Sequence, residues 1–422
     1  MKFENLPKKR IGRLFMVLGI LLFPLLTCLF IVSVNSSNLI GPKLSFVLLI
    51  GASFSLIMLI LGLIFYFTGK DKLKFRFKKG LVVIFALFSF LYTVGGFTFV
   101  GLLYFPGSGF KPWLVTTAMT TMTHQYLAKW FYNDYDVNTV MAANTVVESG
   151  EDTNPDLITF KEPNFNSVTY ANEYDKEVLT KEHEDDIYKI IDINRPNMKG
   201  KLAVVYDPSK VIIGVSKGVG TNINTAYGEF ITAIGERYGA SVAINAGGFY
   251  DPNWNSMGGV PHGVVISQGK LTSNNRSLTN GGGIVGFDSN NKLVLARINA
   301  SQALKQGIRD CVEFGPFLVV NGKASFVKGN GGWGQAPRTA IGQRADGIVL
   351  LLAIDGRQAG SVGADMGDLA EIMLDYGAIN AANMDGGTST AMSLNGKIIT
   401  NPRNGSFAAK TRPVPNAWLV LK

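Results

Sequence analysis

Three long apolar stretches near the N-terminus most constrain how this chain of 422 residues can fold. They cover Ile11–Val34, Leu44–Phe67 and Leu81–Phe105, and each is near the ~20 residues that an α-helix needs to cross a bilayer. Their interiors contain no Asp, Glu, Lys or Arg, whereas transporters and proton pumps usually carry such residues there. The stretches therefore predict three transmembrane helices that act as an anchor. A cleaved signal peptide is a weaker interpretation of the first stretch, because two more follow it.

The charge distribution predicts how such an anchor is oriented. Twelve Lys and Arg against two Asp and Glu precede residue 111, and the remainder is close to neutral, with 28 basic and 29 acidic residues. Basic residues gather before the first stretch and between the second and third, which predicts a cytoplasmic N-terminus and an extracytoplasmic C-terminal domain. The chain has only two cysteines, Cys28 and Cys311, which are far apart in the sequence. An extracytoplasmic domain without disulfides is typical of bacterial envelope proteins, so we expect a multi-pass protein of the bacterial cell membrane. No basic stripe indicates nucleic-acid binding.

Composition along the chain predicts three parts. Residues 1–110 form the membrane anchor, and residues 111–169 hold a juxtamembrane amphipathic helix over Trp113–Tyr132 followed by a polar linker over Asn133–Ser167. Residues 170–422 form a globular domain.

Short apolar segments separated by turn residues predict the fold of that domain. Many of them form hairpins, and two helices are expected, one within Asn222–Tyr238 and one over Asp365–Tyr376. This pattern favours an α+β domain with a mixed, mostly antiparallel sheet and flanking helices. The expected strands cover residues 201–206, 211–215, 241–246, 263–267, 270–271, 283–287, 292–298, 314–320, 338–342, 347–355, 378–384 and 417–421.

Four glycine-rich corners follow or precede these strands, where polar residues commonly build sites. Neither a phosphate-binding loop nor a dinucleotide-binding fingerprint is present, because the spacing of each is missing. The corners are Asn245–Phe249, Gly331–Ala340, Ile354–Arg357 and Asp385–Gly387.

These corners, in this order, resemble the phosphodiester glycosidase family. The resemblance runs from about Tyr188 to Lys422. Besides the corners, it includes Tyr206–Ser209, Gly315–Pro316 and Pro337–Gly342. It implies cleavage of a glycosidic bond whose leaving group is a phosphate.

The resemblance and the chemistry of a phosphate leaving group together suggest catalytic residues. A phosphate leaves readily, so an arginine that neutralises its developing charge is more useful than a strong acid, and Arg338 is the candidate. Asp385 and Asp355 are the candidate carboxylates, one stabilising the oxocarbenium-like carbon or acting as nucleophile, the other acting as base for water. Each alternatively caps a turn or holds a divalent cation, the one cofactor considered possible. His262 is either a proton shuttle or a packed histidine.

Further candidates contact the substrate from the same corners. Asn245 either holds a sugar hydroxyl or acetamido group or fixes its corner, and hydroxyl groups donate to phosphate oxygens. Aromatic residues there either stack on a sugar ring or pack in the core, and glycines allow close backbone approach. The remaining residues of this set are Gly247, Gly248, Phe249, Tyr250, Trp333, Thr339, Gly386, Gly387 and Ser389.

The sequence thus predicts a membrane-anchored glycosidase that hydrolyses sugar-1-phosphodiesters in cell-envelope glycans, with a phosphorylated carbohydrate or envelope polysaccharide and the membrane as partners. Two alternatives stay open. One is a non-catalytic polysaccharide-binding or assembly factor, and the other is a glycosyl transferase of exopolysaccharide biosynthesis.

Overall fold

The computed structural model describes residues 107–121, 124–160, 169–252, 256–275, 282–404 and 408–422, with isolated residues and short runs between 12 and 105. The chain divides into two compact units. One runs to Met119 and includes 124–142, and the other comprises 120–123 and 143–422. The predicted boundaries at residues 110 and 170 stay a prediction.

The prediction of three transmembrane helices is wrong for the part of the chain that the structure describes, where no helix is long and apolar enough to cross a membrane. The helices α4 (Phe110–Met119), α6 (Asp134–Ala143) and α10 (Met366–Asp375) have ten residues each, about 15 Å of helix against a hydrocarbon layer of about 30 Å. The predicted spans at 11–34, 44–67 and 81–105 fall mostly outside the described residues.

The predicted localisation is contradicted by the same finding. We expected a multi-pass protein of the bacterial cell membrane, with its N-terminus cytoplasmic and its C-terminal domain extracytoplasmic, and the helices of the described residues do not support it.

The first unit contains the short helices α4 and α5 (Gln125–Phe131) and most of α6. We expected one helix over Trp113–Tyr132, but α4 ends at Met119 and α5 begins at Gln125. The segment between them is rich in threonine, which has a low helix propensity. The segment expected to be a linker carries α6, the strand β1 (Thr145–Val147) and the 3₁₀ turn η1 (Pro155–Leu157).

The second unit is built from antiparallel sheets, as expected for its α+β fold. A seven-stranded sheet has the order β12-β11-β16-β14-β15-β3-β2. Its strands are β2 (Tyr188–Arg195), β3 (Met198–Val205), β11 (Phe317–Val320), β12 (Lys323–Ala324), β14 (Arg338–Arg344), β15 (Val349–Ile354) and β16 (Ala378–Met384).

Two five-stranded sheets and a short ribbon complete this unit. One sheet has the order β18-β17-β5-β19-β4 and the other β7-β6-β10-β8-β9, while β1 pairs with β13. Their strands are β4 (Val211–Val215), β5 (Ala240–Asn245), β6 (Gly263–Ser267), β7 (Lys270–Asn275), β8 (Gly283–Asp288), β9 (Leu293–Ala296), β10 (Ile308–Phe314), β13 (Phe326–Lys328), β17 (Met392–Leu394), β18 (Lys397–Ile398) and β19 (Asn416–Leu421).

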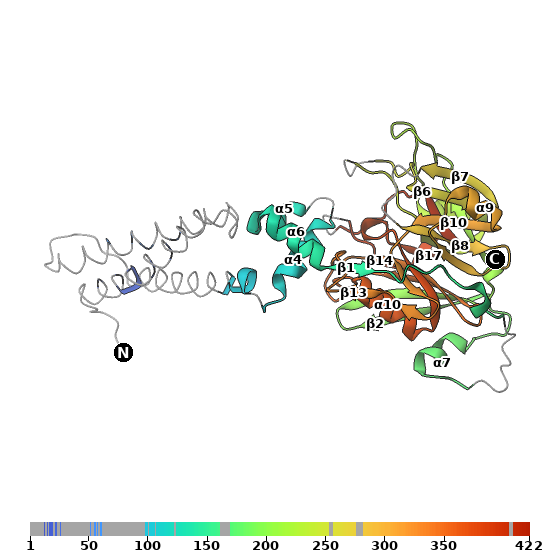
Figure 1. The fold of residues 1–422 in the computed structure, drawn as a ribbon, viewed down its shortest axis with the longest axis horizontal. Helices are drawn as coiled ribbons and strands as arrows, with labels where there is room; N and C mark the ends of the chain where they lie inside the picture. Colours follow the sequence, from blue (N-terminus) through green and yellow to red (C-terminus); the bar gives the residue numbers. More distant parts are fainter. Residues whose placement is uncertain are drawn as a thin grey trace. The chain divides into compact units, whose positions relative to one another are not determined.

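Each large sheet packs a helix against one face. The helix α10 packs on the seven-stranded sheet, α8 (Ile231–Tyr238) on the sheet that contains β5, and α9 (Ala300–Lys305) on the sheet that contains β10. In Figure 1, β6, β7, β8, β10 and α9 lie on one side of this unit, and β2, β14 and α10 on the other. The helix α7 (Glu173–Leu179) is also labelled there.

One hydrophobic core joins the three sheets on their other faces. Trp418 of β19 is fully buried within it, and its ring meets the ring of Phe287 edge-on at 5.7 Å. The indole Nε1 of Trp418 donates to the sulfur of Met384 at 3.4 Å. Because Met384 is the residue before Asp385, this packing fixes the end of β16, from which the glycine corner departs.

Truncating Trp418 tests the weight of this contact. We expect Trp418→Ala to lower the free energy of unfolding by about 3–5 kcal/mol, because it leaves a cavity where the sheets meet. Phe326, which is 68% exposed, is the control, and Phe326→Ala is expected to change stability by no more than about 0.5 kcal/mol. Denaturant unfolding of both variants measures the difference, and equal losses would contradict a shared core.

Candidate active site

The site lies at one edge of the seven-stranded sheet, where three neighbouring strands begin or end. β14 begins at Arg338, which pairs with Ile354 at the end of β15, and the next residue of β14, Thr339, pairs with Met384 at the end of β16. The chain therefore leaves the sheet at Asp355 on one side of Arg338 and at Asp385 on the other. Neighbouring strands lie about 4.8 Å apart, so this register brings three of the predicted corners together.

Asn245 attaches the fourth corner to the same edge. Its amide group donates to the carbonyl of Asp385 at 2.6 Å, and its oxygen accepts from the hydroxyl of Thr339 at 2.9 Å and from the backbone N–H of Ala391 at 3.1 Å. Asn245 is fully buried and Thr339 is 1% exposed. Both predicted substrate contacts are thus occupied by protein groups, and the geometry favours the alternative in which Asn245 fixes its corner.

The glycines of the Asp385 corner are required by close approach. A Cβ at Gly386 would lie 2.9 Å from the carbonyl oxygen of Pro337 and 3.6 Å from Nη1 of Arg338. Gly387 has φ +64°, in the left-handed region, and a Cβ there would lie 3.2 Å from Nη2 of Arg357. The turn is therefore pressed against two guanidinium groups.

The other predicted glycine pair, Gly247 and Gly248, is also closely packed. The N–H of Gly247 donates to the side-chain oxygen of Asn416 at 2.7 Å, and a Cβ at Gly248 would come within 2.8 Å of the ring of Phe314. Close packing thus explains both glycines.

Arg338 is held by backbone carbonyl groups. Its Nε donates to Ala364 at 3.1 Å, and its Nη2 donates to Trp333 at 2.5 Å and Gly334 at 2.7 Å. It is 4% exposed, and the described residues place no ion-pair partner on it. Burial lowers its pKa to about 10, with a further contribution from the positive charge of Arg357, while Asp365 and Asp385 act in the opposite direction.

Arg357 is the second arginine at this turn, and we did not assign it a role from the sequence. Its Nη1 donates to the hydroxyl of Thr388 at 3.2 Å and to the carbonyl of Arg403 at 3.4 Å, and its backbone has φ +59°. Burial lowers its pKa, and no carboxylate of the described residues pairs with it. The only signal in the sequence was its place in the Asp355-Gly356-Arg357 motif.

Asp385 is the carboxylate next to these arginines. Burial raises its pKa to about 6, and the hydroxyl of Ser389, the charge of Arg412 and the N–H of Gly386 hold it from rising further, while Asp251 adds to the rise. Ser389, predicted to contact phosphate, thus makes a hydrogen bond to Asp385. Asp385 and Arg338 are not an ion pair, but the Asp385 charge does raise the pKa of Arg338.

Asp355 and His262, the other two predicted catalytic residues, have their own contacts. Asp355 accepts from the N–H of Asn401 at 2.8 Å; burial raises its pKa, and the charges of Lys201 and Arg403 lower it. His262 donates its backbone N–H to Gly248 at 2.9 Å, and its buried Nδ1 lacks a partner among the described residues. Burial lowers the pKa of His262, which favours the neutral ring.

The aromatic candidates differ in their contacts. Phe249 is stacked by the guanidinium of Arg412 at 4.5 Å, and Trp333 by that of Arg338 at 5.7 Å. Tyr250 donates its backbone N–H to the carbonyl of Val260.

None of the described residues forms a cluster of three or more His, Cys, Asp or Glu side chains that could hold a metal ion.

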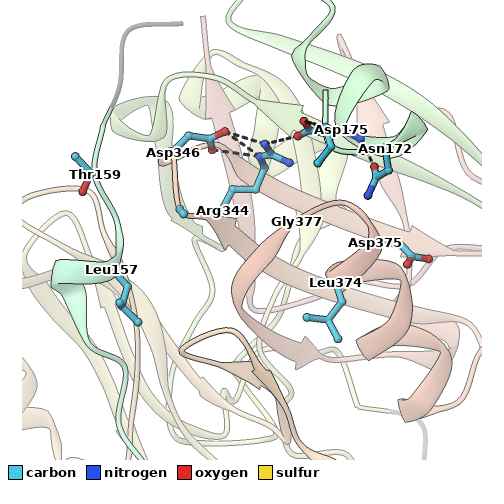
Figure 2. A pocket seen from close by; sticks show the side chains of 11 residues that line it. Leu157, Thr159, Asn172, Asp175, Arg344, Asp346, Leu374, Asp375 and Gly377 are labelled. Atoms are coloured by element: carbon cyan, nitrogen blue, oxygen red, sulfur yellow. Dashed lines mark hydrogen bonds and ion pairs between the residues drawn. The ribbon is translucent and has the colours of Figure 1, made fainter. Parts of the chain in front are cut away.

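A pocket of about 460 Å³ lies at the other end of β14, around Arg344. Figure 2 shows Arg344 between Asp346 and Asp175. Its Nε donates to both oxygens of Asp346 at 3.2 and 3.1 Å, and its Nη2 donates to Asp175 at 2.8 Å. Arg344 is therefore neutralised by two carboxylates.

The comparison with known families shows which family the domain resembles. Residues 238–421 match the phosphodiester glycosidase family. The match covers less than half of the 422 residues. The predicted resemblance to that family is confirmed for these residues.

Individual relatives cover only part of the chain. An SPbeta prophage-derived uncharacterized protein YomE of Bacillus subtilis is 32% identical over 47% of this chain and 31% of its own length. The N-acetylglucosamine-1-phosphodiester alpha-N-acetylglucosaminidase of Bos taurus is 28% identical over 39% of this chain and 33% of its own. The chain thus spans about a third of the length of these relatives.

A solved structure was also matched. The zebrafish N-acetylglucosamine-1-phosphodiester alpha-N-acetylglucosaminidase catalytic domain, auto-inhibited by its pro-peptide, is 22% identical, with a TM-score of 0.47 over 57% of this chain and 85% of that one.

The raised pKa of Asp385 predicts a cost to stability. Between its ordinary value of 3.8 and about 6, the unfolded chain loses this proton while the folded chain keeps it, so stability falls as pH rises through that window. We expect Asp385→Asn to raise the free energy of unfolding by roughly 1–3 kcal/mol at pH 7, with the gain fading at pH 4 and below.

Denaturant unfolding at pH 7 and pH 4 measures this gain. Asp192→Asn is the control, because its side chain is 75% exposed and little change is expected at either pH. A gain at pH 4 equal to that at pH 7 would show that the charge of Asp385 is not its cause.

Proposed function

We propose that this chain hydrolyses the glycosidic bond of sugar-1-phosphodiesters at the Asp385 corner. The observation that carries the proposal is the pair of arginines, Arg338 and Arg357, that press on the Gly386–Gly387 turn without a carboxylate partner among the described residues. Keeping two guanidinium groups close together and largely buried costs free energy, as their lowered pKa values indicate. A bound phosphate offsets this cost, because it accepts from guanidinium groups and neutralises their charge.

The names of the relatives support the same substrate class. The proteins of Bos taurus, Mus musculus and Homo sapiens carry the name N-acetylglucosamine-1-phosphodiester alpha-N-acetylglucosaminidase. A phosphate that carries a sugar on one oxygen can accept hydrogen bonds from both arginines at the turn that follows Asp385. The more detailed predictions of cell-envelope glycans and exopolysaccharide as the source of that sugar stay predictions.

The reaction places the bond to be broken between the arginines and Asp385. The oxygen of water forms a bond to the anomeric carbon, the bond from that carbon to the phosphate oxygen breaks, and the electron pair leaves on the phosphate. Asp385 takes the proton from the attacking water, for which a pKa near 6 is well suited at neutral pH. Arg338 and Arg357 stabilise the charge that develops on the phosphate.

A general acid is not required on the leaving side. The product is a phosphate monoester, whose second pKa is near 6, so it leaves as a stable anion without first receiving a proton. No carboxylate of the described residues forms an ion pair with Arg338 or Arg357, and Asp355 accepts from the N–H of Asn401.

Replacing an arginine tests the phosphate site. We expect the purified full chain to release free sugar from an N-acetylglucosamine-1-phosphodiester, and Arg357→Gln and Arg338→Gln each to lower kcat/KM by about 100-fold or more. Sugar release, followed by chromatography, measures the loss.

The matched control is Arg195→Gln. Arg195 is also a partly buried arginine, but it pairs with Asp375 and Glu371 of α10 and should leave kcat/KM within a few-fold. Native turnover that survives in both site variants would remove the roles given to Arg338 and Arg357. Glycan binding without any turnover by the native chain would favour the non-catalytic alternative, and sugar transfer to an added glycan would favour a transferase.

The pH dependence tests the role of Asp385. Because a base must be ionised to take a proton, kcat/KM is expected to rise with pH and to level off above about 6, following the pKa of Asp385. A profile measured from pH 4 to pH 9 that instead falls through pH 6 would mean that the protonated carboxyl group is the active form.

A further inference from the structure

The loop Gly329–Gly334 holds the guanidinium group of Arg338. The carbonyl oxygens of Trp333 and Gly334 accept from Nη2 of Arg338 at 2.5 and 2.7 Å, and the guanidinium lies over the ring of Trp333 at 5.7 Å. The carbonyl of Ala364, which accepts from Nε at 3.1 Å, belongs to another segment. Two of the three hydrogen bonds that this guanidinium group makes among the described residues therefore depend on the conformation of the loop.

The loop is built mainly from glycine. Four of its six residues are glycines, and all four have φ between +57° and +76°. Glycine has the widest backbone freedom of the amino acids, so a loop of this composition loses much conformational entropy when it is kept in one shape. Contacts from outside the loop are needed to fix the two carbonyl groups that Arg338 uses.

Asn144 supplies such a contact from a segment far away in the sequence. Its side-chain oxygen accepts from the backbone N–H of Asn330 at 3.1 Å, and the residue is 7% exposed. A Cβ at Gly329 would lie 1.9 Å from the same oxygen, so Asn144 and the loop are in direct contact. Within the loop, the side-chain oxygen of Asn330 accepts from the N–H of Gly332 at 3.1 Å. Hydrogen bonds thus lead from Asn144 through Asn330 to the residue before Trp333.

The strand β1, which directly follows Asn144, packs against the same loop. It pairs in antiparallel register with β13, the strand that leads into the loop, and Thr145 lies opposite Lys328. A Cβ at Gly331 would come within 3.0 Å of the side chain of Val146. The pairing gives Asn144 a fixed backbone from which its side chain holds the loop.

We propose that Asn144 is a positioning residue that fixes the Gly329–Gly334 loop and thereby orients the guanidinium group of Arg338 toward the substrate phosphate. The proposal deepens the proposed function and rests on it. Asn144 lies outside residues 238–421, so a segment that the family comparison does not match contributes to the phosphate site. Asn144 acts through Arg338 and is not itself a ligand of the substrate.

The first test follows the guanidinium group of Arg338 in the full chain. Its Nε–H signal, assigned in ¹⁵N spectra by its loss in Arg338→Gln, reports the hydrogen bond to Ala364. We expect Asn144→Ala to shift this signal and to speed its hydrogen exchange about tenfold, because the loop that holds the other end of the group loosens. Gly329→Ala should do the same, since its methyl group displaces the side-chain oxygen of Asn144.

Each variant has a matched control. Thr153→Val also removes a side-chain acceptor from the segment that contains Asn144, but its partner is the N–H of Leu295 in β9. Gly322→Ala also places a side chain at positive φ, +78°, but its Cβ meets nothing within 4 Å. Both controls should leave the Arg338 signal in place. An unchanged signal in Asn144→Ala and Gly329→Ala, or equal changes in the controls, would overturn the proposal.

The second test asks whether the effect on turnover passes through Arg338. We expect Asn144→Ala to lower kcat/KM about tenfold in the native background, and less than about twofold in the Arg338→Gln background. Asn144→Asp, which keeps the acceptor oxygen, should stay within a few-fold of the native chain. A purely structural role would give the same factor in both backgrounds, and that result would contradict the role given to Asn144.

The two tests separate this proposal from the proposed function. A native chain that releases no sugar, but whose Arg338 signal changes in Asn144→Ala and not in the controls, would refute the proposed function alone. A native chain that releases sugar, and whose Arg338 signal is unchanged in Asn144→Ala, would refute the role of Asn144 alone.

Discussion

The amide group of Asn245 is the contact on which the arrangement of the site depends. Asn245 is the last residue of β5 in one sheet. Its side chain makes three hydrogen bonds to the neighbouring sheet and the turn after it: to Thr339 of β14, to Asp385 directly after β16, and to Ala391. Because the group is fully buried, any movement between the two sheets leaves polar atoms unpaired, which is costly. The end of one sheet is therefore held in register with the edge of another.

This fixed edge brings together like charges that repel one another. Arg338 and Arg357 both lie against the Gly386–Gly387 turn, and each donates to carbonyl or hydroxyl oxygens, with no ion pair to a carboxylate of the described residues. Asp385 lies beside them with a raised pKa. Ionisable groups held in such unfavourable states are typical of functional sites, because their cost is recovered when a substrate of complementary charge binds.

The sequence predicts the parts of this arrangement that depend on local pattern. Most strands of the globular domain follow from apolar periodicity and turn residues. The sequence did not predict most of β10, because Arg309, Asp310 and Glu313 interrupt its apolar pattern. In the structure Asp310 is buried and accepts hydrogen bonds from the backbone N–H groups of two other segments. The glycine corners identified the family, and the role of Arg357 did not follow, since it depends on which loop meets the turn in space. The expected membrane spans were contradicted because the described helices are too short.

The most direct measurement is a crystal structure of the Asp385→Asn chain with an N-acetylglucosamine-1-phosphodiester bound. The account predicts phosphate oxygens within hydrogen-bond distance, about 2.7–3.2 Å, of the guanidinium groups of Arg338 and Arg357, with the anomeric carbon facing residue 385. A phosphate bound away from both arginines, for example beside Arg344 at the other end of β14, would contradict it.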